Sequence, residues 1–158
     1  MRITIRTTSA EETMSLGEEL GKRLRPGDVV ALFGDLGAGK TTLTKGIARG
    51  MGVAADVHSP TFTLIHEHPG PIPLYHIDLY RLANEEEVEW IGIDEYMCGD
   101  GVTIIEWADR MQSMLPPERL DIDLRMKGET EREMVFRTGN PRIQAVVKEL
   151  GSDAASCD

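Results

Sequence analysis

The chain has 158 residues, of which 41% are apolar and 28% are charged, as in an ordinary soluble globular protein. This length allows one domain with a sizeable core and is too short for two large ones, and the chain has no apolar run of about 18 residues that could span a membrane. The formal net charge of −10 argues against unaided binding to nucleic acid, because neutralising phosphates requires clustered Lys and Arg side chains.

The N-terminal part of the sequence alternates between strand and helix patterns. Residues 2–7 alternate apolar and polar side chains, which predicts a half-buried strand. Ser9 and Glu12 form a capping box, and leucines then recur every fourth residue, which predicts an amphipathic helix that ends near Pro26. Residues 28–33 are almost continuously apolar, which indicates a strand buried on both faces, as in a parallel sheet.

A glycine-rich segment follows this buried strand directly. Residues 34–41, GDLGAGKT, match the phosphate-binding pattern G-x-x-x-x-G-K-[ST], and an apolar-periodic helix comes next, as such a loop requires. The glycines allow successive backbone N–H groups to point at a phosphate, and the helix adds the positive end of its dipole. Lys40 is therefore expected to reach the outer phosphates of ATP or ADP, and the Thr41 hydroxyl to join the shell of Mg²⁺.

The whole loop is expected to contact the nucleotide. Two of its members have a second interpretation, since Asp35 could be only a turn residue and Thr42 could contact the α-phosphate or merely begin the helix. The predicted nucleotide-binding residues of the loop are Gly34, Asp35, Leu36, Gly37, Ala38, Gly39, Lys40, Thr41 and Thr42.

Two later strand patterns end in an acid, LYHID at Asp78 and TIIE at Glu106. In an open α/β sheet, ligands bind beyond the carboxyl ends of the strands, so both carboxylates are expected near the phosphates. An NTPase needs a carboxylate near Mg²⁺ and a group that orients the attacking water. Asp78 and Glu106 are therefore candidates for catalysis with Lys40 and for metal binding with Thr41, and the pattern leaves open which acid has which role.

Four other side chains have two interpretations each. Thr61 in SPTFT could belong to a switch loop that senses the γ-phosphate, or to a plain turn. His76 is expected to be a packed or capping histidine rather than a catalyst, and Arg81 could form a surface salt bridge. Trp107, directly after Glu106, could belong to the core or cover the nucleotide with its ring.

The C-terminal part predicts a hairpin and a helix. Residues 120–126 and 132–138 alternate around a short polar link, which favours an antiparallel pair. Asn140 and Pro141 then suit the cap and first position of a final helix. A shorter helix is predicted at the acidic segment NEEEVEW, with Asn84 as its cap.

These patterns together predict the α/β class, with a three-layer P-loop NTPase-like fold whose mixed, partly parallel sheet is flanked by helices. Residues 1–150 are expected to form a single ATPase domain, and residues 151–158 a disordered tail. The two cysteines, Cys98 and Cys157, are expected to be ordinary thiols of a cytoplasmic protein.

The ordered segments GDLGAGKTTLTKGIARGMG, SPTFTLIHEH, LYHIDLYRL, IGIDEY and IIEWADR resemble the TsaE family, formerly YjeE, over about residues 28–113. The resemblance implies a Mg²⁺-dependent ATPase of bacterial tRNA threonylcarbamoyladenosine synthesis. It also implies TsaD- and TsaB-like partners, with tRNA contacted only through the complex. By the same resemblance Thr61 belongs to the switch loop, Asp78 to the HxDxYR motif, and Glu106 with Trp107 to the acid–tryptophan motif.

Two other classes of function share the phosphate loop. A small-molecule or nucleotide kinase would need a basic lid, whereas the region between Gly70 and Asp100 is acidic. A switch that only binds ATP would make Glu106 dispensable. Low intrinsic ATPase activity is expected, because no arginine finger is evident in the sequence. The absence of an N-K-x-D or T-K-x-D motif argues weakly for ATP over GTP.

Overall fold

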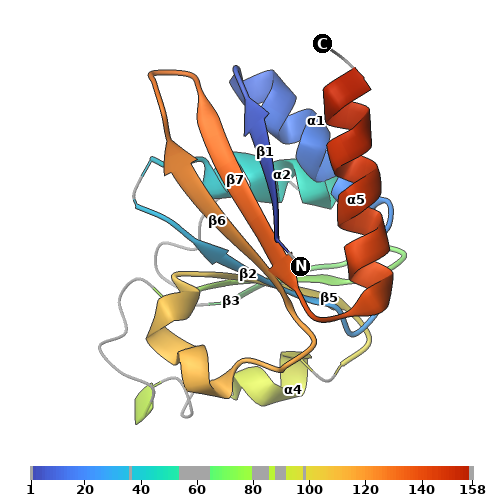
Figure 1. The fold of residues 1–158 in the computed structure, drawn as a ribbon. Helices are drawn as coiled ribbons and strands as arrows, with labels where there is room; N and C mark the ends of the chain where they lie inside the picture. Colours follow the sequence, from blue (N-terminus) through green and yellow to red (C-terminus); the bar gives the residue numbers. More distant parts are fainter. Residues whose placement is uncertain are drawn as a thin grey trace.

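The computed structural model describes residues 2–35, 37–53, 65–79, 86–87, 92–97 and 99–156. Within these residues seven strands form one sheet (Figure 1). The strands are β1 (Arg2–Thr7), β2 (Val29–Phe33), β3 (Ile65–His68), β4 (Leu74–Asp78), β5 (Val102–Glu106), β6 (Leu120–Met126) and β7 (Arg132–Thr138). The helix predicted near Asn84 lies largely outside the described residues.

The centre of the sheet is parallel and its margins are antiparallel. The strand order is β1-β7-β6-β2-β5-β4-β3, in which β6, β2, β5 and β4 pair in parallel. The predicted hairpin of β6 and β7 is antiparallel, as are the β1–β7 and β3–β4 pairs. Because the parallel strands run in one direction, the ends of β2, β4 and β5 meet at one edge of the sheet.

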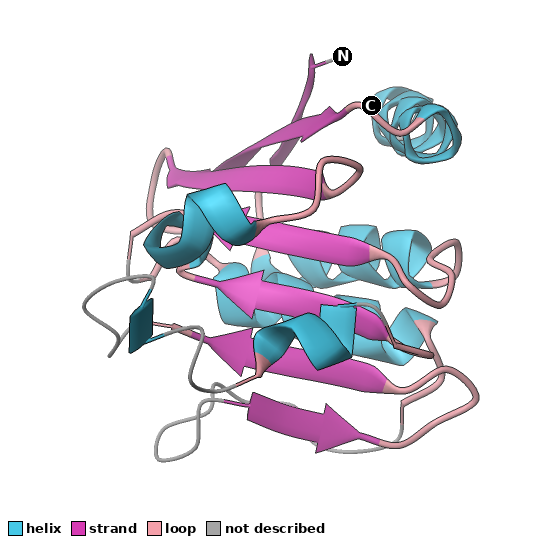
Figure 2. Ribbon diagram, turned by 90° about the horizontal axis from the view of Figure 1, so that it is seen from below, coloured by secondary structure: helices cyan, strands magenta, loops and turns pink. Residues whose placement is uncertain are grey.

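Helices cover both faces of this sheet (Figure 2), which confirms the α/β class. Side chains of α1 (Ala10–Gly21), α2 (Lys40–Gly50) and α5 (Pro141–Ser156) share one core cluster with Val30, Ile104 and Phe136. The second cluster, around Ala31 and Ile105, packs under α4 (Ile93–Met97) and the 3-10 helix η1 (Ala108–Met114). Among the described residues, no helix combines the length and the apolarity needed to cross a membrane.

The predicted N-terminal caps of α1 and α5 are present, whereas the predicted C-terminal end of α1 is wrong. Ser9 Oγ accepts from the Glu12 N–H at 3.1 Å, and Asn140 Oδ1 accepts from the Arg142 N–H at 2.9 Å. Helix α1 ends at Gly21 rather than near Pro26, because the chain tightens into a turn in which the Arg23 N–H bonds the carbonyl of Leu20.

The final helix is longer than its apolar pattern predicts. It extends to Ser156, and so it includes six of the eight residues, 151–158, that we expected to be disordered. The apolar positions of the helix end at Leu150, which is buried, and beyond it the sequence GSDAAS has no apolar stripe that would have predicted helix. Cys157 and Cys98 lie outside the described residues.

Helices α1 and α2 touch through glycines. A Cβ atom placed on Gly46 of α2 would lie 2.2 Å from the carbonyl oxygen of Met14, and one on Gly17 of α1 would lie 2.5 Å from that of Leu43. Both contacts are between backbones, so neither partner can turn aside. This close approach fixes the helix that begins at Lys40 against the helix that begins at Ala10.

Candidate nucleotide site

The predicted phosphate-binding loop connects the end of β2 to the start of α2, between the strand and the helix that the sequence predicts. Gly34, Gly37 and Gly39 have φ angles of 143°, 80° and 103°, values that favour glycine over any residue with a side chain. A Cβ atom on Gly34 would also lie 2.5 Å from the carbonyl oxygen of Leu124 on β6. The Ala38 N–H donates to the carbonyl of Asp35 at 3.1 Å, so Asp35 takes part in the turn through its backbone.

Lys40 lies inside this loop with only 5% of its surface exposed. Its Nζ donates to the carbonyl oxygen of Gly34 at 2.6 Å and lies 3.7 Å from the ring centroid of Trp107. Burial lowers the pKa of Lys40, and nearby carboxylates oppose that shift, with Glu106 first and Asp78 second. The structure thus places both predicted acids in the electrostatic surroundings of the predicted phosphate-binding lysine.

Asp78 and Glu106 end the neighbouring parallel strands β4 and β5 and face each other across the pair. Asp78 is half-buried, whereas only 2% of the surface of Glu106 is exposed. A carboxylate oxygen of Glu106 is bonded to Nε2 of His76, which is completely buried two residues before Asp78. His76 is therefore packed, as expected, but it is also bonded to a candidate catalytic acid.

Trp107 stands at the corner between β5 and η1. Its φ and ψ are 60° and 41°, and it is the only non-glycine residue with positive φ in the described part of the chain. Such a left-handed conformation costs about 1–3 kcal/mol in a bulky residue and is typical of functional sites. Its ring packs partly against the second core cluster and lies against Lys40, so it belongs both to the core margin and to the loop.

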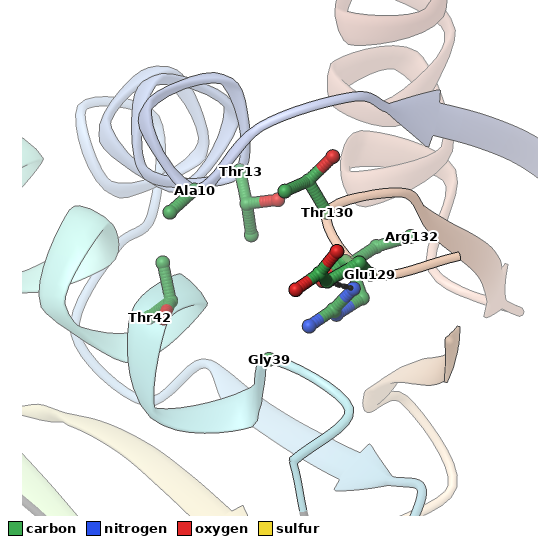
Figure 3. A pocket seen from close by; sticks show the side chains of 7 residues that line it. All are labelled: Ala10, Thr13, Gly39, Thr42, Glu129, Thr130 and Arg132. Atoms are coloured by element: carbon green, nitrogen blue, oxygen red, sulfur yellow. Dashed lines mark hydrogen bonds between the residues drawn. The ribbon is translucent and has the colours of Figure 1, made fainter. Parts of the chain in front are cut away.

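A pocket of about 110 Å³ opens beside the phosphate loop (Figure 3). Its walls come from the start of α1, the start of α2 and the turn between β6 and β7. The lining residues are Ala10, Thr13, Gly39, Thr42, Glu129, Thr130 and Arg132. Thr42 therefore faces a cavity from the first turn of α2, which favours its interpretation as a contact residue.

Sequence reasoning missed Arg132. Its guanidinium donates to the carbonyl of Gly37 in the loop at 3.3 Å and to the carbonyl of Gly128 in its own hairpin at 3.2 Å. These bonds connect the β6–β7 turn to the phosphate loop across a long stretch of sequence. Arg132 opens an alternating strand, so nothing in its local pattern separates it from a surface arginine. Asp109 in η1 was missed in the same way, although its carboxylate also acts on Lys40.

The candidate metal ligands are oxygen atoms, which suit a magnesium ion bound together with a nucleotide. Magnesium in such sites takes one or two protein carboxylates together with substrate phosphates. Thr41 in the first turn of α2 and the acids Asp78 and Glu106 offer that chemistry. No group of three or more His, Cys, Asp or Glu side chains that could hold a metal alone occurs in the described ranges. Leu36 and Thr61 lie outside those ranges.

Comparisons with known proteins agree with this geometry. Residues 7–134 match the family model described as threonylcarbamoyl adenosine biosynthesis protein TsaE. The tRNA threonylcarbamoyladenosine biosynthesis protein TsaE of Bacillus subtilis is 47% identical over 146 residues, which are 92% of this chain and 91% of that protein. The protein of the same name from Treponema pallidum is 44% identical over 80% of this chain and 93% of its own length. The crystal structure of Bacillus subtilis YdiB superposes with a TM-score of 0.82 at 40% identity, covering 97% of this chain and 96% of that one.

Proposed function

Because the chain belongs to the TsaE family of threonylcarbamoyladenosine biosynthesis proteins, we propose that it is a Mg²⁺-dependent ATPase that supports this modification of tRNA. The observation that carries the proposal is the position of Lys40, inside a glycine loop and in the field of two strand-end carboxylates. Burial disfavours the charged form of Lys40, and the phosphates of a bound nucleotide would add negative charge that favours it.

Different residues are proposed to bind the phosphates and the metal. The backbone N–H groups around Gly37 and Gly39 and the start of α2 receive the phosphates, and Lys40 turns from the Gly34 carbonyl toward the outermost phosphate. Thr41, Asp78 and Glu106 are the residues that would hold Mg²⁺ and orient water. When bound, the metal neutralises charge that develops on the phosphates.

The pocket at Thr42 is the proposed site of the nucleoside. It adjoins Gly39 and the first turn of α2, so a nucleotide with its outer phosphates at Lys40 would direct its other end there. Arg132 borders both the pocket and the loop, and its planar guanidinium can stack on a base or bond to a phosphate. The absence of a guanine-reading motif favours ATP as the occupant.

The proposed place of action is a complex with TsaD- and TsaB-like proteins. The net charge of −10 suits a subunit that supports the turnover of a tRNA-modifying partner without gripping the tRNA itself. No arginine finger is evident in the sequence, so hydrolysis by the isolated chain is expected to be slow.

The first experiment measures ATP hydrolysis with Mg²⁺ by the purified chain, alone and with TsaB, TsaD and substrate tRNA, and scores threonylcarbamoyladenosine over many turnovers. We expect modification beyond the first round to require this chain and to be lost in Lys40→Ala. Glu106→Ala should bind ATP and fail to hydrolyse it. If the partners turn over equally well without the chain, the proposed role is wrong, and a phosphoryl acceptor consumed with ATP would indicate a kinase instead.

A second experiment tests the pocket. Arg132→Met should weaken ATP binding by about tenfold, the loss typical of a bond between a charged group and a ligand. Arg125→Met is the matched control, because Arg125 lies in the same hairpin and is bonded to Asp123 instead of the loop. Equal affinities of the two variants, measured by calorimetry, would place the nucleoside elsewhere.

A further inference from the structure

The bond between His76 and Glu106 has a definite direction. Both side chains are almost completely enclosed, with exposed fractions of 0% and 3%. A carboxylate can only accept, so Nε2 of His76 is the donor and carries the hydrogen. The other ring nitrogen, Nδ1, has no hydrogen-bond partner in the described part of the chain. A hydrogen on Nδ1 would therefore be a buried, unsatisfied donor, which costs about 1–3 kcal/mol.

The sheet itself holds the ring in place. His76 lies opposite Ile104 in the parallel register of β4 and β5, and Glu106 follows two residues later on the same face of β5. On this face Asp78 is the direct neighbour of Glu106 across the strand pair, and His76 is the diagonal neighbour of Glu106, two residues earlier on β4. His76 is 0% exposed, and so is Ile104, its register partner on β5.

From this geometry we infer that His76 is a positioning residue, which fixes the direction of the Glu106 carboxylate by a buried hydrogen bond. The inference rests on the proposed ATPase function. Both roles considered for Glu106, holding the metal and orienting the attacking water, require a carboxylate with one fixed direction. Without the donor, Glu106 would keep its place on β5 and lose this constraint on the direction of its carboxylate.

A merely structural role for His76 makes a different prediction. If the bond only satisfied two buried polar groups, its loss would lower the stability of the fold and leave the kinetic constants of the folded fraction unchanged. A positioning role lowers kcat and leaves the KM for ATP nearly constant, because the phosphate loop and Lys40 bind ATP without His76. The two roles can therefore be separated by kinetics on folded protein.

The test compares three variants of the full chain with wild type, together with the partners used above. His76→Leu removes the donor and keeps an apolar side chain of similar bulk. His76→Gln returns an amide N–H group near the position of Nε2. Ile104→Val is the matched control, since it trims the buried neighbour that faces His76 and leaves the bond to Glu106 intact.

We expect His76→Leu to lower kcat by about tenfold or more, the usual effect of losing a partner that orients a functional ligand, with KM changed by less than about twofold. His76→Gln should recover most of this loss, and Ile104→Val should keep kcat within about twofold of wild type. The Tm of each variant identifies the temperature range in which all of them are folded. Wild-type kcat in His76→Leu, or no recovery in His76→Gln, would overturn the positioning role.

Nitrogen NMR of the full chain provides a readout that does not depend on turnover. His76 should show a protonated Nε2 and a bare Nδ1, and Glu106→Gln should shift the Nε2 signal. The reverse tautomer would overturn the inference. Wild-type hydrolysis no faster than that of Lys40→Ala would instead overturn the ATPase proposal and, with it, any catalytic use of His76. The kinetic and spectroscopic results thus distinguish the two failures.

Discussion

Gly46→Ala is expected to destabilise the protein, although alanine is the better helix former. In an open helix, replacing glycine by alanine stabilises by about 0.5–1 kcal/mol. At Gly46 the new Cβ atom would lie 2.2 Å from the carbonyl oxygen of Met14 and 3.1 Å from the backbone nitrogen of Glu18. Helices α1 and α2 would have to separate, and such overpacking costs about 1–3 kcal/mol, or more where backbone meets backbone. We expect the free energy of unfolding to fall by about 2 kcal/mol.

The chain contains its own control for this substitution. Gly151 lies in helix α5, and within the described part of the chain a Cβ atom there would meet only Ile3, at an ordinary contact distance of 3.5 Å. Gly151→Ala should therefore raise the Tm slightly, whereas Gly46→Ala should lower it by about 4–8 °C for a domain of this size. Both values come from thermal unfolding followed by circular dichroism. A higher Tm for Gly46→Ala would refute the close packing of the two helices.

Three further predictions concern charge and capping. Burial lowers the pKa of Lys40, so the charged lysine destabilises the folded protein at pH values below its folded-state pKa. Lys40→Met should therefore have a higher Tm than wild type at pH 7. Thermal melts at increasing pH should show this difference in Tm shrinking as the pH rises through the pKa of Lys40. The hydrogen bond to Asp100 raises the pKa of Tyr75 to about 12, so absorbance titration should show one tyrosine that ionises near pH 12. In Asp100→Asn the same tyrosine should ionise at a lower pH. The stability from this pair should be complete below pH about 10 and be lost toward pH 12. Asn140→Ala removes the cap of α5 and should cost about 1 kcal/mol in urea unfolding, with no change in m.

Most of the fold could be predicted because its signals are local. The alternation in β1, the apolar run of β2 and the caps of α1 and α5 each depend on neighbouring residues. The strand order could not be read in this way. The insertion of β6 beside β2 depends on contacts between residues about 90 positions apart, which leave no periodic trace in one sequence.

The site divides along the same line. The glycine loop has a recognisable sequence pattern, and the two acids stand at the ends of predicted strands. Their proximity at one edge of the sheet could therefore be predicted. Arg132 and Asp109 could not be selected, because their roles depend on which loop or turn the fold brings beside them. His76 was correctly expected to be packed, but its bond to Glu106 appears only when β4 and β5 are in register.

The three walls of the pocket also bear on how the protein is made. They come from residues 10–13, 39–42 and 129–132, so the loop motif leaves the ribosome long before the last wall exists. A nascent chain that has not been synthesised past Arg132 has the complete motif and only part of the pocket. With the pocket as the proposed nucleoside site, we expect full ATP affinity to be acquired late in translation, when the β6–β7 hairpin joins the sheet.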